Sequence, residues 1–187
     1  MKLTVSKRNS EKKSEAKQQR RNGNIPAVLY SSGNPGEAIT IDGREFNAHL
    51  NQIKKGHLPT TVFVLTDADG KERKAIIKDI QYHVTTYSIL HLDFEELHDD
   101  SNVNVKVPIE LTGVADCVGI KLGGVPRQVI RFLRVNCLPK DIPSSFKLDI
   151  TPLKMKEKRK LHDIVIPEGV KPLASNMNEV VVVIAKR

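Results

Sequence analysis

The chain has 187 residues, enough for one large domain or two small ones. Its hydrophobic content of 39% is too high for a disordered chain, and its apolar runs fall far short of the ~20 residues that a membrane-spanning helix needs. The formal net charge of +8 favours a polyanionic or acidic partner, so we expect a folded protein with no membrane partner.

The first half of the chain predicts a sheet of five or six strands around one helix. Short apolar runs bounded by turn residues place the strands at 2–5, 25–30, 38–42, 61–66, 72–83 and 88–94. The polar stretch 6–24 has no apolar periodicity, so it predicts an exposed loop with a helical turn at 15–21.

The helix and one hairpin of this half have clear local signals. Phe46, Leu50 and Ile53 recur at helical spacing, which predicts a helix over 44–56 that stops at its last glycine. The sequence Asp-Ala-Asp-Gly at 67–70 predicts the turn of a hairpin between two strands.

The second half predicts a separate, β-rich domain. A polar, acidic stretch without strand pattern predicts a linker at 97–102. It divides a first domain, 1–96, from a second, 103–187. Short strand patterns separated by Gly and Pro follow at 103–111, 128–137, 146–150, 164–166 and 180–185. The predicted fold class is therefore mainly β, with a few turns of helix.

The positive charge is concentrated in two clusters. Eight basic and two acidic residues fall within 1–30, and five basic and one acidic within 154–160, whereas the rest of the chain is nearly neutral. Localised charge of this kind is typical of contact with nucleic-acid phosphates. A solvated charged segment is the alternative for both clusters.

One group of polar residues resembles a metal or acid–base site. It comprises His83, His91, Asp93, His98, Asp99 and Asp100. Their spacing matches no metal motif and several fall in the predicted linker, so we predict no metal site and no cofactor. His91 and Asp93 alternate with leucine and phenylalanine, so they share one strand face. With Gln81 on a neighbouring strand, they form either a surface hydrogen-bond network or a contact face for nucleotide edges and 2′-hydroxyls.

Enzyme motifs are missing from the sequence. The glycines of 113–124 do not have P-loop spacing, and neither a GxSxG elbow nor HExxH occurs. Cys117 and Cys137 form no CxxC pair, so we expect two buried or idle thiols. The polar N-terminus lacks a secretory signal, and we expect a cytoplasmic protein that is not an enzyme and has no small-molecule substrate.

Three segments occur in the order and spacing of a known family. They are 13–30, Lys78-Asp-Ile-Gln81 and His91-Leu-Asp-Phe94. Together they resemble the bacterial large-subunit ribosomal protein L25 family, and the second half resembles its long general stress (CTC) type. The resemblance implies a six-stranded β-barrel that binds 5S rRNA at the loop E helix in the central protuberance, followed by a β-rich domain. The implied partners are 5S rRNA, the large ribosomal subunit and neighbouring ribosomal proteins.

The resemblance also assigns RNA contacts residue by residue. They fall on Arg8, Lys13, Lys17, Arg20, Tyr30, Gln81, His91 and Asp93. Tyr30 fits either the core or a contact. This chain departs from the family over 12–20, where both glycines, the serine and one arginine of the usual loop are replaced. The nearer alternative function is a regulatory RNA-binding protein outside the ribosome, and an enzyme is the more distant one.

Overall fold

The computed structural model describes residues 1–8, 13–31 and 34–186. The chain divides into two compact units, Met1–Ser101 and Asn102–Arg187. In the part of the chain that is described, no helix has the length and apolar character needed to cross a membrane.

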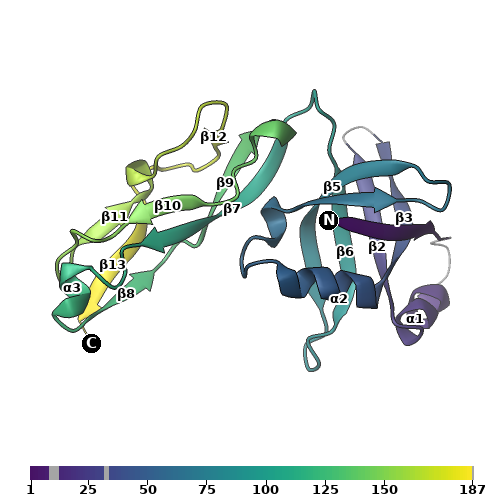
Figure 1. Ribbon diagram of the computed structural model, residues 1–187, viewed down its shortest axis with the longest axis horizontal. Helices are drawn as coiled ribbons and strands as arrows, with labels where there is room; N and C mark the ends of the chain where they lie inside the picture. Colours follow the sequence, from purple (N-terminus) through teal and green to yellow (C-terminus); the bar gives the residue numbers. More distant parts are fainter. Residues whose placement is uncertain (9–12, 32–33, 187) are drawn as a thin grey trace. The chain divides into compact units, whose positions relative to one another are not determined.

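The first unit is a closed barrel of six strands in the order β1-β3-β2-β6-β5-β4 (Figure 1). β1 pairs with β4, and β2 with β6, in parallel, and the other neighbours are antiparallel. Its elements are β1 (Lys2–Lys7), α1 (Lys13–Arg21), β2 (Asn24–Ser31), β3 (Asn34–Asp42), α2 (Gly43–Gln52), the 3₁₀ turn η1 (Leu58–Thr60), β4 (Val62–Thr66), β5 (Glu72–Tyr82) and β6 (Ile89–Glu96).

Aromatic rings fill the barrel core. Phe63 of β4 lies between Phe46 of α2 and Phe94 of β6, with both ring-centroid distances 6.2 Å. All three side chains are fully buried, and burying such a side chain contributes on the order of 1.5–3 kcal/mol. Asp42 caps α2 by accepting a hydrogen bond from the backbone N–H of Arg44 at 2.7 Å. The cap and the Phe46 side chain together hold α2 against the barrel.

Two local predictions in this unit are wrong in detail. Most of the predicted loop 6–24 that is described forms the nine-residue helix α1. α1 has no apolar stripe, but it consists largely of good helix formers, with Glu15 in its first turn and two arginines in its last. α2 ends at Gln52 rather than Gly56, because Ile53 adopts an extended conformation and packs against the core.

The second unit contains two sheets, of order β10-β7-β9-β12 and β11-β13-β8. Each sheet buries one face. Its elements are β7 (Val103–Thr112), α3 (Val118–Lys121), β8 (Gly124–Gln128), β9 (Phe132–Cys137), η2 (Pro139–Asp141), β10 (Phe146–Asp149), β11 (Lys158–Lys160), η3 (Leu161–Asp163), β12 (Lys171–Pro172) and β13 (Val180–Lys186).

The second unit also corrects two predicted strands. The predicted strand 128–137 is interrupted, because the chain leaves one sheet after Gln128 and enters the other at Phe132. The predicted strand 164–166 does not form, and the 3₁₀ turn η3 ends just before it. The predicted fold class is confirmed: a six-stranded barrel is followed by a β-rich second part.

The segment after β6 remains attached to the first unit over its first two residues. The Leu97 side chain is buried, and its backbone N–H donates to the Lys74 carbonyl at 2.8 Å. The Ser31 hydroxyl and His98 Nε2 are 2.5 Å apart. The predicted linker 97–102 therefore begins with two residues that contact the barrel.

We expect a fragment of residues 1–101 to fold alone, because the barrel and its core close within that range. Circular dichroism should record a cooperative thermal transition. A fragment ending at Glu96 lacks the buried Leu97, so its free energy of unfolding should be lower by roughly 1.5–3 kcal/mol. A 1–101 fragment without a cooperative transition would contradict the division into two domains.

Candidate nucleic-acid interface

Strand β6 carries a row of partly exposed polar side chains on the outside of the barrel. Leu92 and Phe94 are fully buried in the core, so His91, Asp93 and Glu95 between and beside them face outward. The pairing of β6 with β5 and β2 then places residues of both strands beside this row. Gln81 of β5 lies opposite His91, and Tyr30 of β2 lies opposite Glu95. We call this surface the β6 face, comprising Tyr30, Asp79, Gln81, His91, Asp93 and Glu95.

A β-bulge in β5 decides which residues join the β6 face. Ile77 belongs to the barrel core, so strict alternation would turn Asp79 inward as well. The register instead shifts between Ile77 and Asp79, and the extra residue is Lys78. Asp79 and Gln81 are therefore both exposed, while Ile80 packs against the core.

His91 and Asp93 are joined by a hydrogen bond. Nδ1 of His91 lies 2.7 Å from Oδ1 of Asp93, as expected for alternate residues whose side chains share one strand face. With Nδ1–H donating to Asp93, Nε2 is the acceptor of the neutral ring or a second donor of the protonated ring. The pair therefore offers a carboxylate oxygen and an oriented imidazole nitrogen at one place.

Helix α1 brings a cation to the β6 face. Nε of Arg20 donates to the carbonyl oxygen of Leu90 at 3.0 Å, immediately before His91 in β6. Arg20 remains exposed, and Lys17 is exposed one turn earlier in the same helix. Lys13 is the first residue of α1, and its side chain lies outside the described part of the structure.

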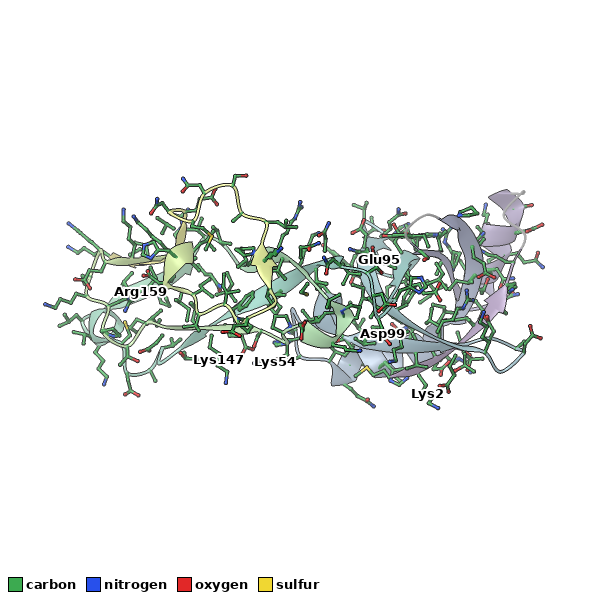
Figure 2. The ribbon with its side chains drawn as sticks, turned by 90° about the horizontal axis from the view of Figure 1, so that it is seen from above. Lys2, Lys54, Glu95, Asp99, Lys147 and Arg159 are labelled. Atoms are coloured by element: carbon green, nitrogen blue, oxygen red, sulfur yellow. The ribbon has the colours of Figure 1, made fainter. Side chains whose placement is uncertain are left out.

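Tyr30 lies half-buried on the outer face rather than in the barrel core. Burial raises the pKa of its hydroxyl above the ordinary value, and negative charge nearby raises it further. The carboxylates responsible are those of Glu95, Asp93 and Asp79. This end of the β6 face is thus acidic. The cation Lys78 lies beside it, with Nζ 2.5 Å from Oε2 of Glu95; Glu95 is labelled in Figure 2.

Arg8 lies apart from the other predicted contacts. Its Nε donates to the carbonyl oxygen of Ile39 in β3 at 3.2 Å, and its backbone N–H donates to Ala38. β3 and β2 separate this position from β6 in the barrel order. The described contacts therefore gather Arg20, Tyr30, Gln81, His91 and Asp93, and leave Arg8 outside that group.

The sequence analysis missed the acidic neighbours Asp79 and Glu95 and their cation Lys78. Glu95 could have been found by continuing the alternation of His91 and Asp93, but the predicted strand stopped at Phe94. Asp79 and Lys78 gave no such signal, because their orientation depends on the bulge.

A hollow of the first unit adjoins Arg20 and Leu90, next to the β6 face. This hollow of about 310 Å³ is lined, besides Arg20, by asparagine, tyrosine, serine, glycine and apolar residues, and no His, Cys, Lys, Asp or Glu lines it. Over residues 1–8, 13–31 and 34–186, no three His, Cys, Asp or Glu side chains come together as possible metal ligands. The chemistry offered by the β6 face is hydrogen bonding and charge.

Both halves of the chain match families of ribosomal proteins. Residues 3–94 match the Ribosomal L25p family, and residues 102–187 match the C-terminal domain of ribosomal protein TL5. The large ribosomal subunit protein bL25 of Chlamydia muridarum is 50% identical over 187 residues, which cover all of both chains. The chain belongs to the bL25 family.

Other members of the bL25 family align with this chain over its full length. The bL25 proteins of Chlamydia abortus and Chlamydia pneumoniae are 46% and 44% identical over 187 residues, again covering all of both chains. The resemblance inferred from the sequence motifs is therefore confirmed for both halves of the chain.

The raised pKa of Tyr30 gives a test of the acidic end of the β6 face. In a Tyr82→Phe/Tyr87→Phe variant, where Tyr30 is the one tyrosine, ultraviolet titration of the phenol should give a pKa above the ordinary value of about 10. Glu95→Gln should lower that pKa, because it removes a nearby negative charge, whereas Glu72→Gln on β5 should not.

The raised pKa of Tyr30 also makes the free energy of unfolding depend on pH. Because folding raises this pKa, the contribution of Tyr30 to the free energy of unfolding is fully present below about pH 10. It is lost as the pH rises through the pKa of the folded state. An identical Tyr30 titration with and without Glu95 would contradict the proximity of the two groups.

Proposed function

We propose that the protein is a structural constituent of the large ribosomal subunit that binds 5S rRNA through its first unit. The contact is with the loop E helix, in the central protuberance. Membership in the bL25 family supports the ribosomal part of this proposal. The observation that carries the RNA contact is the β6 face itself, where an amide, an imidazole and a carboxylate line up beside the cations of α1.

The two parts of the proposed interface have different tasks. Lys17 and Arg20 are exposed on α1 and neutralise phosphates, which supplies most of the affinity. Gln81 and His91 lie directly opposite each other in the sheet and present an amide and an imidazole as hydrogen-bonding groups. Such groups can distinguish nucleotide edges and 2′-hydroxyls, whereas a contact to a phosphate carries no sequence information.

The β6 face suits a helical RNA. Its polar side chains come from three adjacent strands on the outside of the barrel, and the minor groove of an RNA helix is wide and shallow enough for such a surface to reach. The chain has no Trp, and its aromatic content is 4%, which supplies few platforms for stacking single-stranded bases. An RNA helix with accessible base edges is therefore the better match than a single strand.

Asp93 is the most informative residue of the interface. Its carboxylate would be repelled by phosphates unless it accepts hydrogen bonds, and one is already supplied by His91. The remaining oxygen lone pairs suit a base amino group or a 2′-hydroxyl. This role accounts for a negative charge in the middle of an RNA-binding surface.

The cations of α1 are expected to set the salt dependence of binding. Replacing Lys13, Lys17 and Arg20 by Ala should reduce the slope of log K against log salt by about 2 to 3 for 5S rRNA, at roughly 0.7–0.9 per lost phosphate contact. A filter-binding series measures the slope. The control Lys55→Ala/Lys71→Ala/Lys74→Ala removes the same charge from the same unit and should leave the slope nearly unchanged. An unaltered slope in the first variant would place the phosphate contacts elsewhere.

Asp93→Asn should reduce the preference for 5S rRNA over an unrelated RNA duplex. Asn keeps an oxygen that can accept from His91 but loses the charge that strengthens a hydrogen bond from a base amino group. Competition binding with both RNAs measures the preference. Asp79→Asn is the matched control, because Asp79 pairs in register with Asp93 on the same face. If Asp93→Asn raises the affinity for both RNAs equally, Asp93 is only a repulsive charge.

Co-sedimentation of the full chain with large ribosomal subunits tests the ribosomal assignment. The family membership leads us to expect the protein in the subunit fraction at physiological salt. Binding to 5S rRNA without co-sedimentation would favour a regulatory RNA-binding protein outside the ribosome.

A further inference from the structure

The second unit has a positively charged sheet face of its own. Along β7, Asn104 and Lys106 are exposed and alternate with buried valines. Along β9, Phe132 and Arg134 are exposed and alternate with Leu133 and other buried residues. The sheet therefore buries one side and exposes polar and charged groups on the other.

Strand register gathers three cations on that exposed side. Lys106 lies directly opposite Arg134, and Asn104 lies opposite Asn136. Asn136 is also opposite Lys171 of β12, on the other side of β9. We call this surface the β7–β9 face, comprising Asn104, Lys106, Phe132, Arg134, Asn136 and Lys171. Its cations come from three strands far apart in the sequence, so no run of basic residues reveals it.

The fold gains no stability from placing Lys106 opposite Arg134. Side chains directly opposite each other in an antiparallel pair have Cβ atoms about 4.5–5.5 Å apart, and like charges there are destabilising. Among the described residues, no carboxylate lies within ion-pair distance of Lys106, Arg134 or Lys171. The fold thus keeps a repulsive arrangement that a bound polyanion would relieve.

Two other cations of the same unit have acidic neighbours. Lys147 of β10 (Figure 2) lies opposite Glu110 of β7, and Lys121 forms an ion pair with Asp116 at 3.2 Å. Glu110, the carboxylate on the exposed side of β7, also accepts a hydrogen bond from Ser145 at 3.3 Å. Acidic neighbours therefore accompany Lys121 and Lys147, whereas no ion pair joins the three cations of the β7–β9 face to a described carboxylate.

We propose that the β7–β9 face is a second RNA-binding surface, separate from the β6 face, which holds the phosphates of an RNA helix. Lys106, Arg134 and Lys171 supply the phosphate contacts. The Asn136 amide, oriented by its 2.8 Å hydrogen bond to Asn104, lies among them for a ribose 2′-hydroxyl. Phe132 is 41% exposed beyond Arg134 and gives the end of the surface an aromatic contact for a sugar or base. This combination favours RNA over an acidic protein segment, which needs only the charges.

The test uses the full chain with Lys17 and Arg20 replaced by Ala, so that the first unit contributes little phosphate binding. The probe is a fluorescein-labelled regular RNA duplex, and anisotropy gives its affinity over a range of salt concentrations. Adding Lys106→Gln/Arg134→Gln/Lys171→Gln should reduce the slope of log K against log salt by about 2 to 3. Gln is shorter than Lys or Arg but keeps a polar side chain, and it removes the repulsion, so thermal unfolding should show no loss of stability.

The matched control is Lys121→Gln/Lys140→Gln/Lys147→Gln in the same background. It removes the same charge from the same unit, but from positions with acidic neighbours in space or in sequence, so the slope should stay unchanged. Equal slopes for the two triple variants would overturn the proposal. Loss of binding to poly-glutamate with unchanged RNA binding would assign the face to an acidic protein instead. Because the probe is a regular duplex, this outcome is independent of whether the β6 face recognises 5S rRNA.

Discussion

The burial of Leu92 and Phe94 in the barrel core is the constraint on which the candidate interface depends. Once these side chains point inward, His91, Asp93 and Glu95 must point outward, because successive residues of a strand face opposite sides. Pairing of β6 with β5 and β2 then adds Gln81, Asp79 and Tyr30 in fixed register. The position of the β6 face is thus set by apolar residues that pack in the barrel core on the other side of the same strands.

Cations and carboxylates occupy different parts of the candidate interface of the first unit. The cations of α1 lie at one end of the β6 face, where Arg20 is attached to β6 through a backbone carbonyl. The carboxylates of Asp79, Asp93 and Glu95 surround Tyr30 towards the other end. An acidic surface lowers nonspecific affinity for any polyanion, so a ligand must compensate with hydrogen bonds to those carboxylates. The β7–β9 face of the second unit, by contrast, carries cations without a described ion-pair partner, which suits binding that depends little on nucleotide sequence.

Much of the first unit followed from local signals. The alternation around His91 and Asp93, the helical spacing of Phe46, Leu50 and Ile53, and the turn at 67–70 each specify one element through side-chain period or turn chemistry. The motifs of residues 13–30 and of His91-Leu-Asp-Phe94 led to the correct family. α1 was predicted only as a helical turn at 15–21 within a loop, because its residues have helical propensity but no apolar stripe, and periodicity detects only helices that bury one face.

The sequence by itself determined the fold class, the family and the polar face of β6, because each depends on residue types at short, regular spacing. The tertiary structure alone decided which residues stand beside that face. The bulge at Lys78 turned Asp79 and Gln81 outward, the barrel order separated Arg8 from β6, and strand pairing placed Lys106 opposite Arg134. Each of these depends on hydrogen bonding between strands far apart in the chain, and register between such strands is set by the packing of the whole core rather than by any local pattern.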